Sequence, residues 1–151
     1  MTEIYCMTPT HTFWKDTIAL AENCSWKVGP LLARKMKSND FKPWERVFAA
    51  CVDGKAAGFC TLAEKDELPP QYSFTPFIGF VFVDKPYRGR RLSQSMIQSA
   101  TTYARELGYE KIYIMSGEVG LYEKYRFVKL GDYTTIYGTV DQLFVKAIAA
   151  D

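Results

Sequence analysis

The stretch FIGFVFVDKPYRGRRLSQSMIQSA, residues 77 to 100, joins a nearly unbroken apolar run to an amphipathic pattern of helical period. Residues 77 to 83 are typical of a strand that is buried on both faces, in the middle of a sheet with helices on either side. The pattern after it predicts a helix from about Gly89 to Leu107, with one apolar and one polar face. Four basic residues stand ahead of or at the start of this helix: Lys85, Arg88, Arg90 and Arg91.

This basic turn predicts a binding site for an anion. A helix that starts just after a buried strand offers unpaired backbone N–H groups and a positive dipole end. Gly89 allows a sharp bend and a close approach to the backbone, and Ser93 can add a hydroxyl donor. The arginines can pair with further phosphate charge, so a pyrophosphate is the ligand suggested. The alternative is a solvated basic turn, because the stretch has neither the GxxxxGK[ST] nor the GxGxxG spacing.

The rest of the chain alternates strand and helix patterns around this unit. The Asp53-Gly54 pair predicts a hairpin between two strands, and residues 65 to 76 read as a loop with three prolines. The order predicts one α/β layer sandwich with a mixed sheet. The other predicted elements are a strand at 2–7, helices at about 13–22, where Thr10 or Thr12 would be the cap, and at about 30–37, a strand at 111–115, a short helix within 117–127, and closing strands around 127–130, 134–138 and 142–148.

Composition limits the classes of protein to consider. The chain has 151 residues, 48% hydrophobic and 24% charged, which is typical of one soluble globular domain. The net charge of +2 implies no general surface for polyanions. No apolar run is long enough for a membrane span, and the first residues do not resemble a signal peptide, so we expect a cytoplasmic protein. Four cysteines without a CxxC pair and one histidine indicate no metal site; a disulfide stays open, but reduced thiols are the default.

Two motifs resemble one known family. FVFVDKPYRGRRLSQSMI, residues 80 to 97, resembles the acetyl-CoA-binding segment of the GCN5-related N-acetyltransferases (GNAT), with its pattern Arg/Gln-x-x-Gly-x-Gly/Ala. GLYEKYRF, residues 120 to 127, resembles the second family signature, LYEKLGF. The element order is similar over essentially the whole chain. The resemblance implies a single domain over residues 1–151, with a GNAT-like three-layer α/β/α fold and a central mixed, mostly antiparallel sheet.

The resemblance also implies a cofactor and roles for particular residues. Acetyl-CoA would be the co-substrate. Its pantetheine arm would meet backbone groups at a bulge where the central strand splays from its neighbour, and its pyrophosphate would lie in the basic turn. Tyr122 would stand near the thioester sulfur and donate a proton to the leaving thiolate. The residues implied for the cofactor are Val81, Phe82 and Val83 for pantetheine and Arg88, Gly89, Arg90, Arg91, Leu92 and Ser93 for the pyrophosphate.

Some residues depart from the family pattern. Arg91 and Ser93 replace the two paired glycines, and Arg126 replaces the glycine before Phe127. We expect Arg91 to be tolerated only if its Cβ points away from the phosphate, where its side chain could itself reach a phosphate oxygen. We expect Arg126 to occupy a backbone conformation that does not need a positive φ.

The acceptor side is less defined. Trp26 and Trp44 flank the second predicted helix, which in this family walls the acceptor pocket, and they could line it by apolar or cation–π contact. Each could equally be a core tryptophan. Three loop carboxylates, Glu64, Asp66 and Glu67, could attract a cationic amine or simply be solvated, and the sequence does not identify the general base.

The function expected from the resemblance is N-acetyl transfer from acetyl-CoA to a primary amine of a small molecule or peptide, by direct attack in a ternary complex. A catalytically silent acyl-CoA-binding sensor or interaction module is the alternative. A nucleic-acid-binding domain is disfavoured by the balanced charge. We expect no metal and no membrane or nucleic-acid partner, and the closing strands would permit a homodimer without requiring one.

Overall fold

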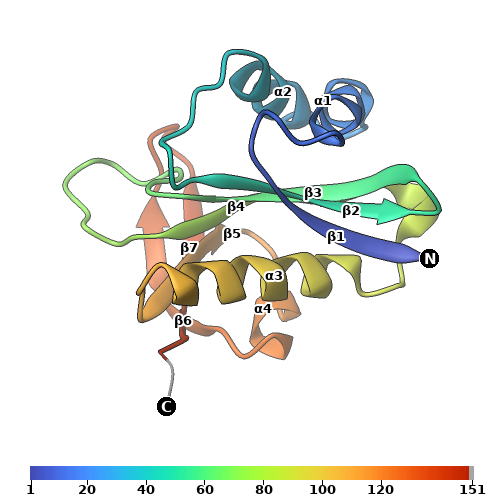
Figure 1. Ribbon diagram of the computed structural model, residues 1–151. Coiled ribbons are helices and arrows are strands. Elements are labelled where there is room, and N and C mark those ends of the chain that lie inside the picture. Colours follow the sequence, from blue (N-terminus) through green and yellow to red (C-terminus); the bar gives the residue numbers. More distant parts are fainter. Residues whose placement is uncertain (150–151) are drawn as a thin grey trace.

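The computed structural model describes residues 1–149, and a seven-stranded sheet runs through it in the order β1-β2-β3-β4-β5-β7-β6 (Figure 1). Within the described residues, β4 and β5 are the one parallel pair; every other pair is antiparallel. The predicted mixed, mostly antiparallel sheet is therefore confirmed. The strands are β1 (Thr2–Met7), β2 (Arg46–Val52), β3 (Lys55–Ala63), β4 (Phe77–Val83), β5 (Lys111–Ser116), β6 (Val128–Thr134) and β7 (Val140–Ala147).

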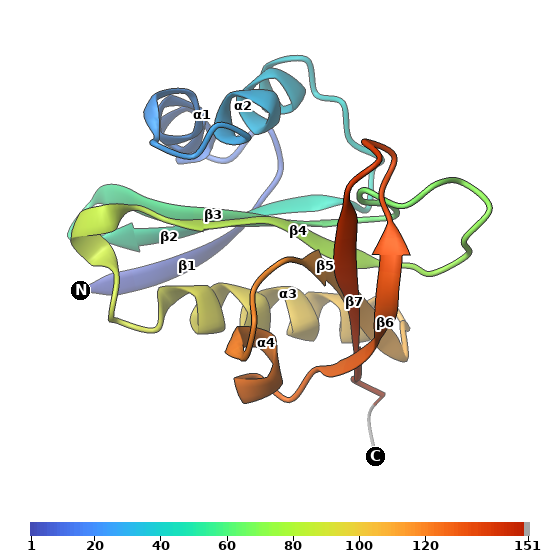
Figure 2. The same ribbon diagram turned by 180° about the vertical axis from the view of Figure 1, so that it is seen from behind.

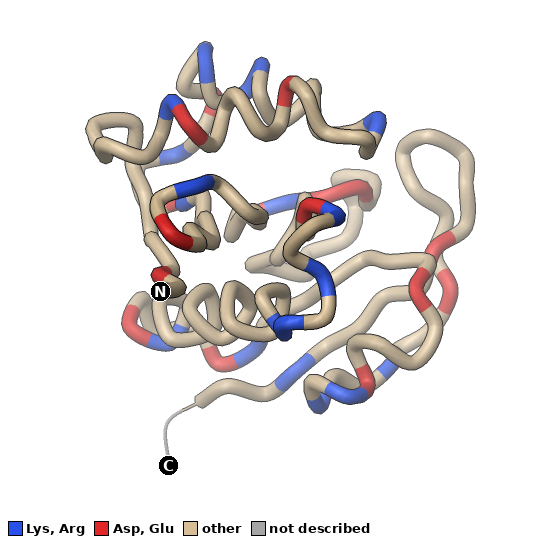
Figure 3. Tube along the Cα trace, turned by 90° about the vertical axis from the view of Figure 1, so that its right-hand side faces the viewer, with Lys and Arg blue, Asp and Glu red and all other residues tan. Residues whose placement is uncertain are grey.

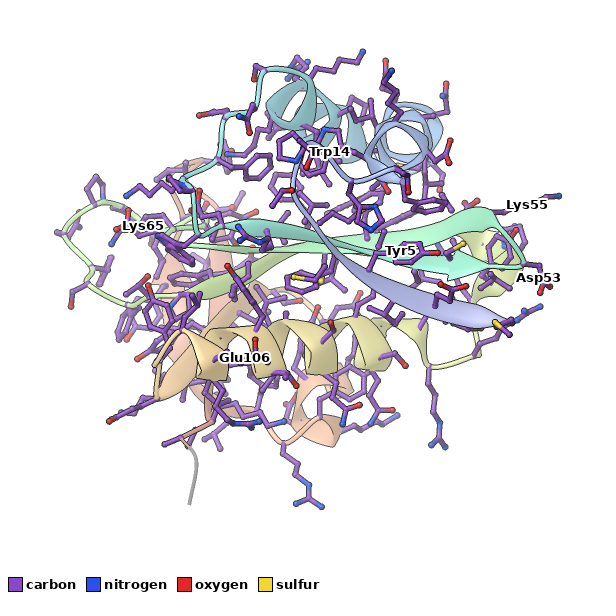
Figure 4. The ribbon with its side chains drawn as sticks, in the orientation of Figure 1. Tyr5, Trp14, Asp53, Lys55, Lys65 and Glu106 are labelled. Carbon is purple, nitrogen blue, oxygen red and sulfur yellow. The ribbon has the colours of Figure 1, made fainter. Side chains whose placement is uncertain are left out.

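Helices cover both faces of the sheet, which gives the predicted three layers. One face carries α1 (Trp14–Asn23) and α2 (Gly29–Lys37), and the other carries α3 (Leu92–Glu106) and α4 (Leu121–Lys124) (Figures 1 and 2). Each face has its own apolar core, and Trp14 lies between the first helical layer and the sheet (Figure 4). No helix in residues 1–149 has the length and apolar character needed to cross a membrane.

Several element boundaries differ from those that the sequence predicts. The N-cap of α1 is Phe13, with no side-chain cap; neither Thr10 nor Thr12 caps it, and the Phe13 N–H instead donates to His11 Nδ1 at 3.0 Å. The closing strand predicted around residues 134–138 is wrong, because residues 135–139 form the turn between β6 and β7. The last two residues of the predicted domain, 150 and 151, lie outside the described part of the chain.

The central strand parts from its parallel neighbour after two residue pairs. Phe77 pairs with Tyr113 and Ile78 pairs with Ile114, and the pairing with β5 ends there. On its other side β4 stays paired with β3, but two of its residues, Phe80 and Val81, stand opposite the single residue Cys60. This is a β-bulge, and Phe80 takes a φ of 51° within it. From Gly79 onward, β4 therefore has a backbone edge toward β5 with no strand to pair with.

Candidate active site

The turn after β4 is hydrogen-bonded to the sheet at its start, and it ends in backbone amides that have no acceptor within α3. The Asp84 N–H donates to the Ala57 carbonyl at 2.8 Å, and the Asp84 carboxylate caps a short 3-10 helix, η1 (Lys85–Tyr87). Gly89 then bends the chain at a φ of 84°. The first helical hydrogen bond of α3 runs from the Ser95 N–H to the Arg91 carbonyl, so the earlier amides of this helix have no acceptor within it. Figure 3 shows basic residues gathered at this end of the molecule.

A pocket of about 280 Å³ lies at the start of α3. It contains most of the residues that the resemblance implies for the pyrophosphate, and it adds Tyr125, which the sequence analysis did not single out. The Tyr125 and Ser93 hydroxyls lie 2.9 Å apart and form a hydrogen bond, so one of them donates to the other and the second keeps a free proton. The sequence did contain a pointer to Tyr125, because this residue stands where the family signature LYEKLGF has its second leucine. The pocket is lined by Val83, Arg88, Gly89, Arg91, Leu92, Ser93 and Tyr125.

The arginines of the turn are not equivalent. Arg88 donates from Nε to the Val83 carbonyl at 3.0 Å, and its guanidinium lies over the Phe82 ring at 5.9 Å from the centroid. The Arg90 guanidinium lies over the Tyr87 ring, 5.7 Å from its centroid, and Arg90 does not line the pocket. Arg91 does line the pocket and is exposed. Arg88 and Arg91 are therefore the two arginines placed to meet an anion in this pocket.

Two arginines occupy left-handed backbone positions where the family pattern has glycine. Arg91 is the N-cap of α3 with a φ of 58°. The expectation that Arg126 avoids a positive φ is wrong, because Arg126 has a φ of 70°. It follows α4 and closes it, since the Arg126 N–H donates to the Glu123 carbonyl and the Phe127 N–H to the Tyr122 carbonyl, both at 3.0 Å. These bonds offset a conformational cost of about 1 kcal/mol for a non-glycine residue.

Tyr122 lies in the core on the α3 and α4 face and is 4% exposed. Its ring packs against those of Phe127 and Phe144, at centroid distances of 6.1 and 5.7 Å. Burial raises the pKa of Tyr122, the Cys60 thiol and the Glu118 carboxylate raise it further, and the Ser116 hydroxyl opposes them. The phenol therefore keeps its proton near neutral pH and can act as a donor.

The two tryptophans lie on different faces of the sheet. Trp26 stacks on Phe82 with ring centroids 6.0 Å apart and lies 6.3 Å from the Phe80 ring, so it covers the bulge on the α1 and α2 side. Trp44 packs against the core on the α3 side, 5.6 Å from the Tyr109 ring. The structure therefore does not bring the two together, and Trp26 is the one beside the point where β4 and β5 part.

The loop after β3 is tied down by hydrogen bonds at several points. The Ile136 N–H donates to the Glu67 carbonyl at 2.7 Å, and the Thr75 hydroxyl donates to the Glu64 carbonyl at 2.9 Å. The Lys65 ammonium, at the end of the sheet opposite Asp53 and Lys55 in Figure 4, donates to a carbonyl of the same loop. These bonds connect the loop to the end of β3 and to the turn before β7.

Asp66 of this loop reaches the central strand. A Cβ on Gly79 would lie 3.4 Å from Asp66 Oδ1 and 3.4 Å from Thr61 Oγ1, so the carboxylate stands directly over Gly79. Glu64, by contrast, pairs with Lys42 at the surface, which lowers its pKa. Of the three carboxylates that the sequence analysis could not separate, Glu64 is thus turned outward and Asp66 is turned onto the sheet.

The surroundings of Asp66 favour its neutral form. Burial raises the pKa of this carboxyl to about 7, and the negative charges of Glu67 and of Asp141 on β7 add to the effect. Lys35 on α2 opposes them. Protein surrounds the carboxyl on most sides, yet the residue keeps some accessible surface. A carboxyl with a pKa near 7 is suited to general-base catalysis at neutral pH.

Comparison with known proteins identifies the class. Residues 11–127 match the family described as "Acetyltransferase (GNAT) family", and the chain belongs to this family. GNAT proteins use acetyl-CoA, so the chain is an acyltransferase by family. A search of the curated proteins finds no match.

Solved structures share the fold at low sequence identity. Aminoglycoside 6'-acetyltransferase type Ii has a TM-score of 0.73 and 16% identity, with 99% of each chain covered. A GNAT acetyltransferase from Streptococcus pneumoniae has a TM-score of 0.71 and 15% identity, covering 99% of this chain and 100% of its own. A candidate streptothricin acetyltransferase from Bacillus anthracis str. Ames, solved with acetyl coenzyme A, has a TM-score of 0.58 and 21% identity, covering 72% of this chain and 66% of its own.

The raised pKa of Asp66 predicts how stability depends on pH. The folded state holds this proton more tightly than the unfolded chain, whose carboxyl has an ordinary pKa of 3.8. The contribution to the free energy of unfolding is therefore complete below pH about 4 and is lost as pH rises through about 7. At pH 8, Asp66→Asn should be more stable than wild type by about 2 to 4 kcal/mol.

Urea denaturation at pH 5 and pH 8 measures this difference. Asp132→Asn is the matched control, because Asp132 is exposed and pairs only with Lys129 at the surface. A stability gain for Asp66→Asn that is equal at both pH values would contradict the prediction.

Proposed function

We propose that this protein transfers an acetyl group from acetyl-CoA to a primary amine of a small molecule or peptide, by direct attack in a ternary complex. The observation that carries the proposal is the arrangement at the end of β4. An anion pocket, an unpaired backbone edge and a buried tyrosine meet where β4 and β5 part. Family membership supplies the cofactor class, and the low identity of the solved relatives leaves the acceptor to be found.

The cofactor would bind by its two polar parts. The pyrophosphate would accept hydrogen bonds from the first amides of α3 and from the Ser93 or Tyr125 hydroxyl, with Arg91 adjacent. The amide-bearing pantetheine arm would pair with the free edge of β4 at Val81, Phe82 and Val83. The Val83 carbonyl is already bonded to Arg88, so a pantetheine amide that takes its place would free this guanidinium for phosphate.

The chemistry needs an oxyanion donor and an acid. A backbone N–H near Val83 would stabilise the negative oxygen of the tetrahedral state. Tyr122 would give its proton to the leaving thiolate. Burial raises the pKa of the Cys60 thiol and leaves it a poor nucleophile, which argues against an acyl-enzyme at this residue. The proposal includes a cytoplasmic location, which the four free cysteines favour.

Acceptors named for the solved relatives guide the first assay. The solved relatives include an aminoglycoside 6'-acetyltransferase, a candidate streptothricin acetyltransferase and a candidate phosphinothricin N-acetyltransferase, so these small molecules are the first acceptors to test. The purified protein is incubated with acetyl-CoA and kanamycin, streptothricin, phosphinothricin, spermidine or a short peptide, and release of the CoA thiol is followed. Thiol release that depends on an amine is expected. Binding of acetyl-CoA with no turnover of any amine would instead support the silent acyl-CoA-binding alternative.

Arg91 is expected to contribute to cofactor affinity. Arg91→Gly keeps the left-handed N-cap but removes the guanidinium, so the Kd for acetyl-CoA should rise about tenfold, the loss of one charge-assisted hydrogen bond. Arg91→Ala should show a similar loss of affinity and be less stable than Arg91→Gly, because alanine keeps a Cβ in the left-handed conformation. Isothermal titration measures both, and Lys55→Ala is the control, since it removes one positive charge from the same end of the sheet (Figure 4). An unchanged Kd for both Arg91 variants would refute this role.

Tyr122 is expected to act in turnover and not in cofactor binding. Tyr122→Phe removes the proton donor but keeps the ring that packs against Phe127 and Phe144, so kcat should fall by about 100-fold with the acetyl-CoA Kd unchanged. Tyr109→Phe, a tyrosine packed against Trp44 on the far part of the core, is the matched control. Full turnover by Tyr122→Phe would remove the general-acid role.

A further inference from the structure

We propose that the Asp66 carboxylate is the general base that takes the proton from the attacking amine. This inference rests on the proposed function and names a catalytic residue that the sequence does not identify. It depends on where Asp66 lies, what surrounds it and where Tyr122 lies relative to it.

Asp66 stands at the residue where β4 loses its partner. Gly79 directly follows Ile78, the last β4 residue paired with β5, and the carboxylate lies over Gly79. Because Gly79 has no side chain, nothing on β4 separates this carboxylate from the strand edge at that position. A β4 side chain there would stand in van der Waals contact with Asp66 Oδ1 and Thr61 Oγ1.

Asp66 and Tyr122 lie on opposite faces of the sheet. Cys60, Leu62 and Ile78 pack into the core that contains α3 and Tyr122. Side chains alternate along a strand, so Thr61 and Gly79 face the other way, toward α1 and α2. Asp66 is on their side. Asp66 and Tyr122 therefore face each other through the sheet at the point where β4 and β5 part. An acetyl carbonyl at that point would have the amine on the Asp66 face and the thiolate on the Tyr122 face.

The charges around Asp66 fit a cationic acceptor. Glu67 from the same loop and Asp141 from β7 face it with negative charge, and Lys35 from α2 is the basic group that opposes them. No hydrogen bond from the described residues stabilises the charged form of Asp66. An ammonium group would supply the missing partner on arrival. Trp26 and Phe80 lie beside the same stretch of β4 and provide an apolar and aromatic wall.

The step balances without another reactant. The acceptor ammonium first loses one proton to water. Its nitrogen lone pair then attacks the thioester carbon, the C–N bond forms, and Asp66 takes a second proton from nitrogen. The C–S bond breaks with its electron pair on sulfur, and Tyr122 protonates the thiolate. Asp66 then releases a proton to solvent, and the Tyr122 phenolate recovers one. The products are the amide and the CoA thiol.

The test compares wild type, Asp66→Asn, Asp66→Glu and Asp132→Asn with acetyl-CoA and whichever amine of the panel wild type acetylates. For wild type, kcat should rise with pH through about 7. Asp66→Asn should lose this limb of the profile and turn over at least 100-fold more slowly at pH 7.5, with an unchanged Kd for acetyl-CoA. Asp66→Glu should recover part of the rate, and Asp132→Asn should match wild type.

Each outcome is decisive. If Asp66→Asn raises only the KM of the amine and keeps the kcat and its pH profile, Asp66 binds the acceptor but is not the base, and the inference is overturned. If Asp66→Asn is fully active, the inference also fails while acetyl transfer stands. If wild type binds acetyl-CoA but acetylates no amine, the proposed function itself fails, and this result is distinct from the other two because it is seen without any variant.

Discussion

The parting of β4 from β5 is the constraint on which the rest of this structure depends. A strand in the middle of a sheet normally pairs on both edges, because buried N–H and C=O groups without partners are costly. Here the pairing ends after Ile78, and the bulge at Phe80 and Val81 turns the strand away from β5. The free edge is a cost to the protein alone, and a ligand with its own amides can remove that cost. Pantetheine has such amides, which is why the edge and the cofactor suit each other.

Backbone strain lies on both sides of this edge. Phe80, Arg91 and Arg126 all have positive φ, at the bulge, at the start of α3 and at the end of α4. Three non-glycine residues in this conformation are unusual for so small a region. At Arg126 the helix-closing hydrogen bonds offset the strain, and they fix the carbonyl of Tyr122. At Arg91 no side-chain hydrogen bond caps α3, so no such bond offsets the strain at this residue.

Sequence patterns predicted the fold well, because local signals carried most of it. The apolar run at 77–83, the Asp53-Gly54 turn and the helical period after Gly89 each depend on neighbours in the chain. The left-handed Arg126 was missed because the hydrogen bonds that stabilise it come from the fold of α4, and residue type alone argues against that conformation. Trp26 and Trp44 were indistinguishable in sequence, since the face that each one meets depends on the path of the chain around α2.

The position of Asp66 also depends on the tertiary fold and could not be predicted from local sequence. In sequence it is one of three acidic residues in a loop, and nothing local separates it from Glu64. Its environment comes from β3, β4, β7 and α2 together, and from the contact that holds Glu67 to the turn before β7. Asp66 could therefore be proposed as the general base only when these elements were placed in space.

One physical cause produces both the acid and the base of the proposed reaction. Burial raises the pKa of Tyr122 and of Asp66 alike, because both groups are charged when deprotonated. The pKa of Tyr122 is raised from its ordinary value of 10.0, so the phenol stays protonated at neutral pH and is available as a donor to the leaving thiolate. Starting from 3.8, Asp66 is moved up to the pH at which a base both exists in its charged form and has affinity for a proton. In the proposed reaction, the two faces of one sheet would thus perform opposite proton transfers. This arrangement lowers the free energy of unfolding, because the ionised Asp66 carboxylate over Gly79 destabilises the folded state at the pH where it could act as a base.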